Sequence, residues 1–224
     1  MTTDILNISE EQLVDYSKAH NEPSWMTELR KKALKLTETL EMPKPDKTKL
    51  RKWDFDSFKQ HDVKGDVYQS LSQLPESVRE IIDVDHSKNL VIQHNNTIAY
   101  TQVDDNASKD GVIVEGLADA LMNHSDLVQK YFMKDAVTVD EHRITALHTA
   151  LVNGGVFVYV PKNVVVEHPV QYVVLHDDEN ASFYNHVIIV TEESAEVTYV
   201  ENYLSNASGE GNQLNIISEV IAGA

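Results

Sequence analysis

The stretch 154–175 constrains the fold of this chain more than any other part of the sequence. It is rich in Val, Tyr and Phe, which suit the pleated, half-buried surface of a β-sheet. Gly154-Gly155 opens the stretch, and corners at Pro161 and Pro169 divide it into three short predicted strands. These corners lack the Asn-Gly or Asp-Gly pairs that tight hairpins favour. Short strands that turn repeatedly in one sense predict a β-solenoid.

Residues 1–85 are predicted to form a helical N-terminal domain. Ser9, with Gln12 three residues later, matches the capping box of a helix start. A second helix is expected to begin after Pro23, with an apolar face and a basic face. The apolar face is predicted to contain Trp25, Leu29, Ala33, Leu36 and Leu40, and the basic face Arg30, Lys31, Lys32 and Lys35. We expect the basic face to be solvated or to dock an acidic partner.

Residues 86–224 are predicted to be a mixed transition segment that leads into a β-rich core from about residue 154. Two strand-like runs flank Asn95-Asn96, which indicates a hairpin, and a helix ends at Asn153-Gly154. Further strands are expected over 183–190, 195–203 and 213–221. The last of these is apolar, and no polar capping element follows it. We therefore expect a solenoid that is truncated at its C-terminus, in the front part of a longer protein.

The composition restricts the partners and the compartment. The chain of 224 residues has 36 acidic and 19 basic side chains and a formal net charge of -17, which argues against nucleic acid and anionic membranes as partners. It has no apolar run near the roughly 20 residues that a membrane-spanning helix needs, and its start lacks a signal peptide. Its lack of cysteine excludes disulfides and thiolate ligands. We expect a cytoplasmic protein.

Several of the ten histidines are candidates for a metal site. His142 and His148 are six residues apart and fall on different faces of a helix. His168, His176 and His186 lie on or beside predicted strands and could approach one another in a coiled sheet. The spacing matches no established metal-binding motif, and a histidine at a strand end is more often a hydrogen-bonded or surface residue. The sequence therefore assigns no metal ligand.

Other polar groups also have simpler structural explanations than catalysis. Asp140-Glu141-His142 suggests a base with an orienting carboxylate, but acidic residues at a helix start are better explained as caps. Asp177-Asp178-Glu179 lacks the alternation of a calcium loop and is expected to be a solvated acidic loop. Gly209-Glu210-Gly211 is too short for a phosphate-binding loop. There is no Gly-x-Ser-x-Gly motif. We therefore assign no catalytic or cofactor-binding residue.

Three segments resemble one known protein family. Residues 151–164, with Val170-Gln171 after them, combine a helix end, a glycine pair, a valine strand and a Pro-Lys corner in one order. This order is similar to the core signature of the SufB/SufD family. Residues 23–34 and 195–201 resemble the same family. The likeness touches both the helical and the β-rich parts of the chain.

The resemblance implies a fold and a function. The implied fold class is α+β, mainly β: a right-handed parallel β-helix after a helical N-terminal domain. The implied role is in the SUF system of iron–sulfur cluster assembly, where SufB-like and SufD-like proteins pair and bind the ABC-type ATPase SufC. SufB-like members carry scaffold cysteines, so the absence of cysteine here points to the SufD-like side. No site residue is carried over.

We therefore expect a non-catalytic scaffold or assembly subunit that acts with a SufB-like protein and a SufC-like ATPase. The chain itself is expected to hold no cofactor, and the iron–sulfur cluster is handled by the full complex. One alternative is a β-helix carbohydrate-active enzyme that uses paired carboxylates. Another is a histidine-based iron-binding protein that uses His168, His176 and His186. A homodimer formed by strand addition at an open sheet edge is a further alternative.

Overall fold

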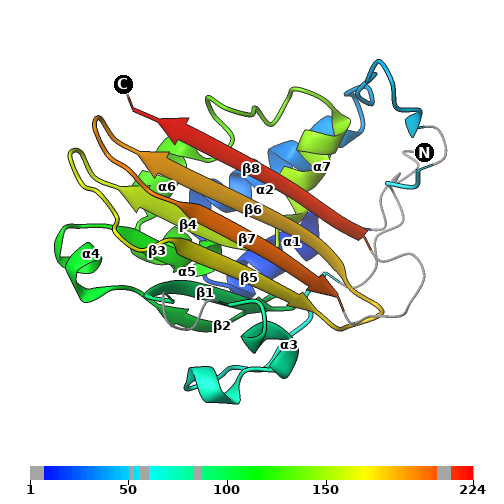
Figure 1. Ribbon diagram of the computed structural model, residues 1–224. Coiled ribbons are helices and arrows are strands. Elements are labelled where there is room, and N and C mark those ends of the chain that lie inside the picture. The colour runs from blue at the N-terminus through cyan, green and yellow to red at the C-terminus, as the bar shows by residue number, and fades with distance from the viewer. Residues whose placement is uncertain (1–7, 51–52, 56–60, 83–86, 206–212, 224) are drawn as a thin grey trace.

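The computed structural model describes residues 8–50, 53–55, 61–82, 87–205 and 213–223. Two β-sheets lie against each other, and helices cover the outer side of one of them (Figure 1). The first part of the chain supplies two of the covering helices and two short helical turns. These elements are α1 (Glu10–Ala19), α2 (Ser24–Thr37), η2 (Leu71–Gln73) and α3 (Glu76–Arg79).

Local signals explain where the first two helices begin. The Ser9 side chain accepts a hydrogen bond from the Gln12 amide, and the Gln12 side chain returns one to Ser9, so the predicted capping box is confirmed. Pro23 precedes α2, as predicted. The buried face of α2 differs from the predicted one, since it contains Met26, Arg30, Ala33 and Thr37. Trp25 and Leu29 are only partly buried.

The remaining helices and the strands alternate along the chain. The helices are α4 (Asp105–Lys109), α5 (Leu117–Asn123), α6 (Ser125–Tyr131) and α7 (Arg143–Leu151). The strands are β1 (Asn89–His94), β2 (Thr97–Gln102), β3 (Ile113–Gly116), β4 (Gly154–Val160), β5 (Val170–His176), β6 (Ser182–Thr191), β7 (Tyr199–Ser205) and β8 (Gln213–Ala222). Within the described residues, no helix is long and apolar enough to cross a membrane.

The strands form two four-stranded sheets. The first sheet has the order β2-β1-β5-β7 and the second has the order β3-β4-β6-β8. In each sheet three strands are parallel, and an antiparallel strand, β2 or β3, lies at one edge. The predicted hairpin at Asn95-Asn96 is confirmed, because β1 and β2 are antiparallel and Asn95 takes the left-handed φ of 51°. The opposite edges of the two sheets are formed by β7 and β8.

The predicted right-handed parallel β-helix is wrong. The chain forms two mixed sheets of four strands, without a closed solenoid. The stretch 154–175 contains two strands rather than three, and β4 and β5 belong to different sheets. In the segment between β4 and β5, Val165 forms an isolated bridge with Glu196, which follows β6 in the sequence. Residue preference indicates that a strand exists, but it does not specify which partner the strand pairs with. The predicted division into domains at residue 85 stays a prediction.

Apolar side chains pack in three layers. Between the sheets lies a core of mainly valine residues from β1, β3, β4, β5 and β6, which includes Val91, Val158 and Val174. On the outer side of the second sheet, Phe157 and Ile188 pack against Leu13 of α1 and other helical residues. A smaller cluster lies between α3 and the outer side of the first sheet. Strands β4 and β6 of the second sheet are therefore buried on both faces, as their almost uninterrupted apolar sequences require.

Candidate functional site

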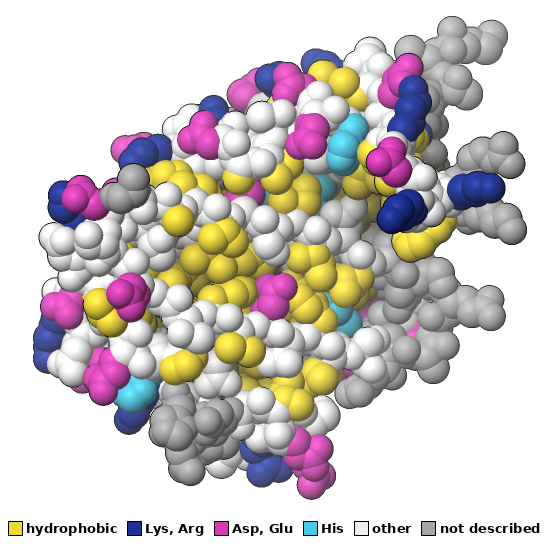
Figure 2. Space-filling view, turned by 45° about the horizontal axis from the view of Figure 1, so that its top comes forward, with side chains coloured by type: hydrophobic (Ala, Val, Ile, Leu, Met, Phe, Trp, Pro, Cys, Tyr) yellow, Lys and Arg dark blue, Asp and Glu magenta, His cyan; other side chains and the backbone are white. Residues whose placement is uncertain are grey.

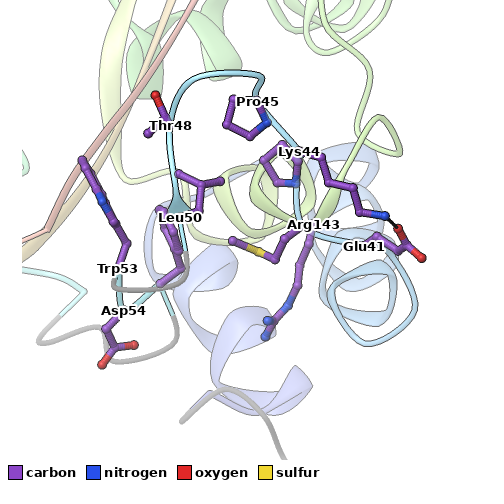
Figure 3. Close-up of a pocket in the computed structure, with 11 residues that line it drawn as sticks. Glu41, Lys44, Pro45, Thr48, Leu50, Trp53, Asp54 and Arg143 are labelled. Atoms are coloured by element: carbon purple, nitrogen blue, oxygen red, sulfur yellow. Dashed lines mark hydrogen bonds and ion pairs between the residues drawn. The ribbon is translucent and has the colours of Figure 1, made fainter.

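One surface pocket lies between the loop after α2 and the start of α7. It has a volume of about 670 Å³ and is lined by Glu41, Met42, Pro43, Lys44, Pro45, Thr48, Leu50, Trp53, Asp54, Phe55 and Arg143. Figure 3 places Trp53 and Thr48 on one side and Glu41, Lys44 and Arg143 on the other, with Leu50 between them.

Three charged groups of this pocket are engaged in structural contacts. Lys44 pairs with Glu41, and Arg143 Nε donates to the Thr37 carbonyl at 3.0 Å. Trp53 is 63% exposed and stacks on Phe55. Apolar and aromatic walls with a few charged groups are typical of pockets that bind a small molecule.

A second candidate surface is the open side of the two sheets. Along β8, Leu214, Ile216 and Val220 are exposed and share one face of the strand. Val220 lies opposite Ile189 of β6, which lines the inter-sheet core, so this face points toward the space between the sheets. Tyr199 and Tyr203 of β7 contribute partly buried rings on the facing sheet. We call these five residues the β7–β8 face. Figure 2, which turns the β8 edge toward the viewer, shows hydrophobic side chains gathered on this side of the molecule.

The histidines named as metal candidates do not converge in the predicted way. His168 lies between β4 and β5, and its carbonyl accepts a hydrogen bond from Asn89. His176 is buried at the end of β5 and stacks on Phe183 with ring centroids 3.6 Å apart. Burial lowers the pKa of His176 to about 4. Neither ring nitrogen of His176 has a hydrogen-bond partner among the described residues.

His186 instead belongs to a buried chain of four side chains, which we call the histidine chain. Asn215 Oδ1 lies 2.8 Å from His148 Nδ1, and His148 Nε2 lies 3.0 Å from His186 Nδ1. His186 Nε2 lies 2.8 Å from Glu219 Oε2. The two histidines and Glu219 have no exposed surface. Burial, followed by repulsion from His186, holds the pKa of His148 well below its usual value.

The residues at the start of α7 have a structural role that differs from the predicted one. We expected Asp140 and Glu141 to cap the helix, but both side chains are exposed and neither lies in the first turn. The cap is His142, whose Nδ1 accepts a hydrogen bond from the Thr145 amide at 3.1 Å. The helix begins at Arg143, so the acidic residues are too early in the chain to reach its free amides.

The acidic segment 177–179 forms a surface loop. Asp177 accepts hydrogen bonds from His94 Nε2 at 2.8 Å and from Asn95 Nδ2 at 2.9 Å. Burial alone would raise the pKa of Asp177, but these hydrogen bonds and the charge of His94 hold it below its usual value. Asp178 accepts a bond from the Asn180 amide, and Glu179 is exposed. In the part of the chain that the structure describes, no group of three or more His, Asp or Glu residues could hold a metal ion. Gly209-Glu210-Gly211 lies outside the described residues.

The basic face predicted for α2 is only partly solvated. Arg30 is buried, and Lys31 and Lys35 form ion pairs with Glu10. Lys32 lines a groove of about 430 Å³ between α2 and residues 129–140. The prediction was wrong for Arg30, because its partners are distant in the sequence.

Sequence reasoning also missed the histidine chain. One signal for it existed, since His148 shares a helix face with Leu147 and Leu151, and a polar residue among core residues requires a buried partner. The partner itself, His186, is 38 positions away in the sequence.

Comparison with known proteins gives a consistent result. A family model described as the SufBD protein N-terminal region matches residues 10–172. The iron-sulfur cluster assembly protein SufD of Bacillus subtilis is 48% identical over 219 residues, which cover 97% of this chain and 50% of that protein. A SufBD family protein of Staphylococcus epidermidis is 27% identical over 96% of this chain and 48% of its own length. One from Pyrococcus horikoshii is 27% identical over 89% and 46%.

The chain thus spans about half the length of the curated relatives that it matches. The family model covers most of the described helices and strands, from the start of α1 into β5. Its match includes the glycine pair and valine strand of the sequence signature. The similarity to SufD is greater than that to the other two relatives. From this match we conclude that the chain belongs to the SufBD family.

Proposed function

We propose that this chain is a non-catalytic assembly subunit in iron–sulfur cluster assembly, which acts with a SufB-like protein and a SufC-like ATPase. The observation that carries the proposal is the 48% identity to SufD of B. subtilis over 97% of the chain. The name of that relative states its role in iron–sulfur cluster assembly. The proposal extends this role to the present chain and adds the two partners.

The chemistry of the chain supports a role through contacts rather than through catalysis. These 224 residues contain no cysteine, so the thiolates that hold an iron–sulfur cluster have to come from outside them. In this proposal the SufB-like partner supplies the thiolates and the SufC-like partner hydrolyses ATP. The cluster is cargo of the full complex, which works in the cytoplasm. The present chain contributes a rigid platform of two packed sheets.

The β7–β8 face is the surface at which we expect a partner to bind. Exposed apolar side chains that lie together on a sheet edge are typical of protein–protein contacts. Leu214, Ile216 and Val220 have 46%, 37% and 64% exposure, so each has apolar surface left to bury. The edge of β8 also offers backbone groups for added strand pairing.

Co-expression tests the proposal. An affinity-tagged form of the chain is produced together with a SufB-like protein and a SufC-like ATPase, and the purified material is analysed by size-exclusion chromatography with mass detection. SufD of B. subtilis, tagged in the same way, serves as the positive control. We expect the chain to retain the SufB-like protein. Capture by the control protein but not by the chain would overturn the proposal.

A matched pair of substitutions tests the surface. Leu214→Asp places a charge on the β7–β8 face, whereas Met122→Asp does so on α5, where the side chain is 47% exposed. Because the two positions have nearly equal exposure, a general effect of the new charge should be similar for both. We expect Leu214→Asp to reduce capture of the partner by at least about tenfold and Met122→Asp to leave it unchanged. Equal capture by both variants would exclude this face as the contact.

A further inference from the structure

The groove between α2 and residues 129–140, which we call the α2 groove, lies on the helical side of the second sheet. Its volume of about 430 Å³ is within the usual range of binding pockets. Its floor is apolar, with Trp25 and Leu29 of α2 on one side, and Phe132 and Met133, which follow α6, on the other. Aromatic and methionine side chains at the centre of a concave surface are typical of sites that contact another protein.

Contacts beneath the floor fix the shape of the α2 groove. Met133 has a left-handed φ of 51°, which is unfavourable for a side chain of this size. Its amide donates a hydrogen bond to the buried Glu219 Oε2 at 2.9 Å, which holds this backbone conformation. On the other side, Trp25 Nε1 donates to Ser125 Oγ at 2.9 Å, and the Trp25 ring meets that of Phe132 edge-on, with centroids 6.2 Å apart. Walls that are already ordered lose little conformational entropy when a partner binds.

The rim of the α2 groove carries more unpaired positive than negative charge. Lys32 on α2 and Lys134 on the opposite wall are exposed, and neither side chain forms an ion pair or a hydrogen bond with another residue of the described ranges. Of the two carboxylates in the lining, Glu28 already binds Lys31 at 3.0 Å, so Asp140 alone opposes the two lysines. This excess is opposite in sign to the formal net charge of the chain, which is -17. The rim therefore attracts a carboxylate more than the rest of the surface does.

The arrangement of these groups favours one class of partner. An apolar centre with a charged rim is the usual anatomy of a protein–protein contact, whereas a small polar ligand needs polar groups inside its pocket. The net charge opposes nucleic acid and anionic membranes. One wall of the groove is a helix of 14 residues, along which a second helix can pack with its apolar side chains on the floor.

We propose that the α2 groove binds an acidic amphipathic helix of a partner protein. Apolar side chains of that helix lie on Trp25, Leu29 and Met133, and carboxylates beside them pair with Lys32 and Lys134. The site is separate from the β7–β8 face, because the groove lies on the helical side of the second sheet and that face points into the space between the sheets. A chain with both surfaces can hold two partners at the same time.

Binding of synthetic peptides to the whole chain tests the proposal. The first peptide is an amphipathic helix of about 14 residues, or roughly four turns, with leucine on one face and glutamate beside that face. Its basic twin has lysine in place of each glutamate, and a third peptide keeps the glutamates but has serine in place of leucine. Fluorescence anisotropy of the labelled peptides measures each Kd.

We expect the acidic amphipathic peptide to bind about tenfold more tightly than either of the other two, because only this peptide matches both the floor and the rim. Equal binding of the acidic peptide and its basic twin would overturn the proposal. So would the absence of binding by the acidic peptide.

Charge reversal on the protein tests the lysines. Lys32→Glu combined with Lys134→Glu should invert the preference, so that the basic twin binds more tightly than the acidic peptide. Lys18→Glu combined with Lys109→Glu changes the net charge by the same amount at exposed positions on α1 and α4, and should keep the wild-type preference. The same change in both double variants would show that only the net charge matters and would refute the assignment.

The methyl group of Met133 locates the bound peptide. In NMR spectra of the chain with labelled methionine methyl groups, the Met133 signal is identified by its absence from Met133→Leu. The acidic peptide should shift this signal and leave that of Met122 on α5, which is 47% exposed, unchanged. A Met133 signal that stays constant while the peptide binds would exclude the α2 groove as the site.

Discussion

Two buried polar clusters hold α7, and they differ in the kind of charge that they bury. One cluster contains Arg30 of α2, Glu22 and Ser17, and we call it the arginine cluster. The other is the histidine chain, which contacts α7 through His148. In the arginine cluster Glu22 and Arg30 form an ion pair in which both side chains are almost fully buried. The histidine chain has one carboxylate and two imidazole rings, and burial holds the pKa of one of these rings, His148, well below its usual value.

The arginine cluster satisfies every charge that it buries. Arg30 donates to Glu22 through two nitrogens and to the carbonyls of Ala150 and Val152 at 2.9 and 2.7 Å, so it also caps the end of α7. Ser17 donates to the same carboxylate at 2.7 Å. Burial alone would raise the pKa of Glu22, but Arg30 and Ser17 hold it below its usual value.

The difference teaches that one helix can be held by two clusters of which only one changes its contribution to stability with pH. A carboxyl group with a lowered pKa contributes its stability above the pKa of the unfolded chain, so Glu22 contributes equally from about pH 5 upward. A histidine with a lowered pKa is neutral in the fold. Its contribution is lost as pH falls below about 6.5, because the unfolded chain then binds more protons.

The largest expected effect is acid destabilisation. Burial holds the pKa of both His61 and His176 to about 4, and that of His148 lies well below its usual value. Each group lowered to about 4 removes roughly 3 kcal/mol from the free energy of unfolding by pH 4. Urea denaturation at a series of pH values should show a steep loss between about pH 6.5 and 4. A free energy of unfolding that stays constant over this range would contradict the difference drawn between the arginine cluster and the histidine chain.

The second largest effect is expected for Glu22→Gln. It leaves the guanidinium of Arg30 buried without a counter-charge, which should cost about 3–5 kcal/mol of unfolding free energy. The loss should be the same at about pH 5.5 and pH 8, because Glu22 is ionised in the folded and unfolded chain at both. Denaturation at the two pH values measures it. A loss that varies strongly with pH would show that the arginine cluster also titrates there.

Glu219→Gln should have a smaller effect. The amide group can still accept one backbone hydrogen bond, but it faces the Val137 or Met133 amide with a donor instead of an acceptor. One buried amide is left unpaired, which costs about 1–3 kcal/mol. Denaturation at pH 7.5 measures the loss, and hydrogen exchange should locate it in β8 and residues 132–137. Uniform loosening of the whole chain would contradict a local role for Glu219.

The smallest effect is expected at an ion pair on the surface. Lys162 and Glu193 form an ion pair, but both side chains are more than half exposed. Water screens such a pair, so Lys162→Ala should leave the denaturation midpoint unchanged within error. A shift as large as that for Glu219→Gln would show that burial does not separate strong contacts from weak ones in this protein.

The sequence predicted the elements of the fold better than their arrangement. The capping box at Ser9 and the hairpin at Asn95 depend on neighbouring residues, so local patterns could find them. The pairing of β4 with β6 depends on residues about thirty positions apart, and strand propensity contains no information on that choice. The predicted β-helix was wrong because the partners of the strands were wrong.

The candidate sites show the same limit. Arg30 was assigned to a solvated face, since its hydrogen-bond partners Ala150 and Val152 lie 120 and 122 positions away. His186 was grouped with His168 and His176 because all three are near strands. The structure joins it to a helical histidine instead. Sequence spacing can suggest which side chains are candidates for a functional site, but only the fold determines which of them come into contact.

The order of strand pairing has a consequence for synthesis on the ribosome. Gly154 lies opposite Asn185, Val170 opposite Tyr199 and Ser182 opposite Gln213, so β6, β7 and β8 each add to a strand made about thirty residues earlier. At about 5–20 residues per second, only a few seconds separate a strand from its template. From β6 onward the nascent chain can therefore grow strand by strand. Each of these last strands finds its partner soon after synthesis, which shortens the time that unpaired strand edges are exposed to other proteins in the cell.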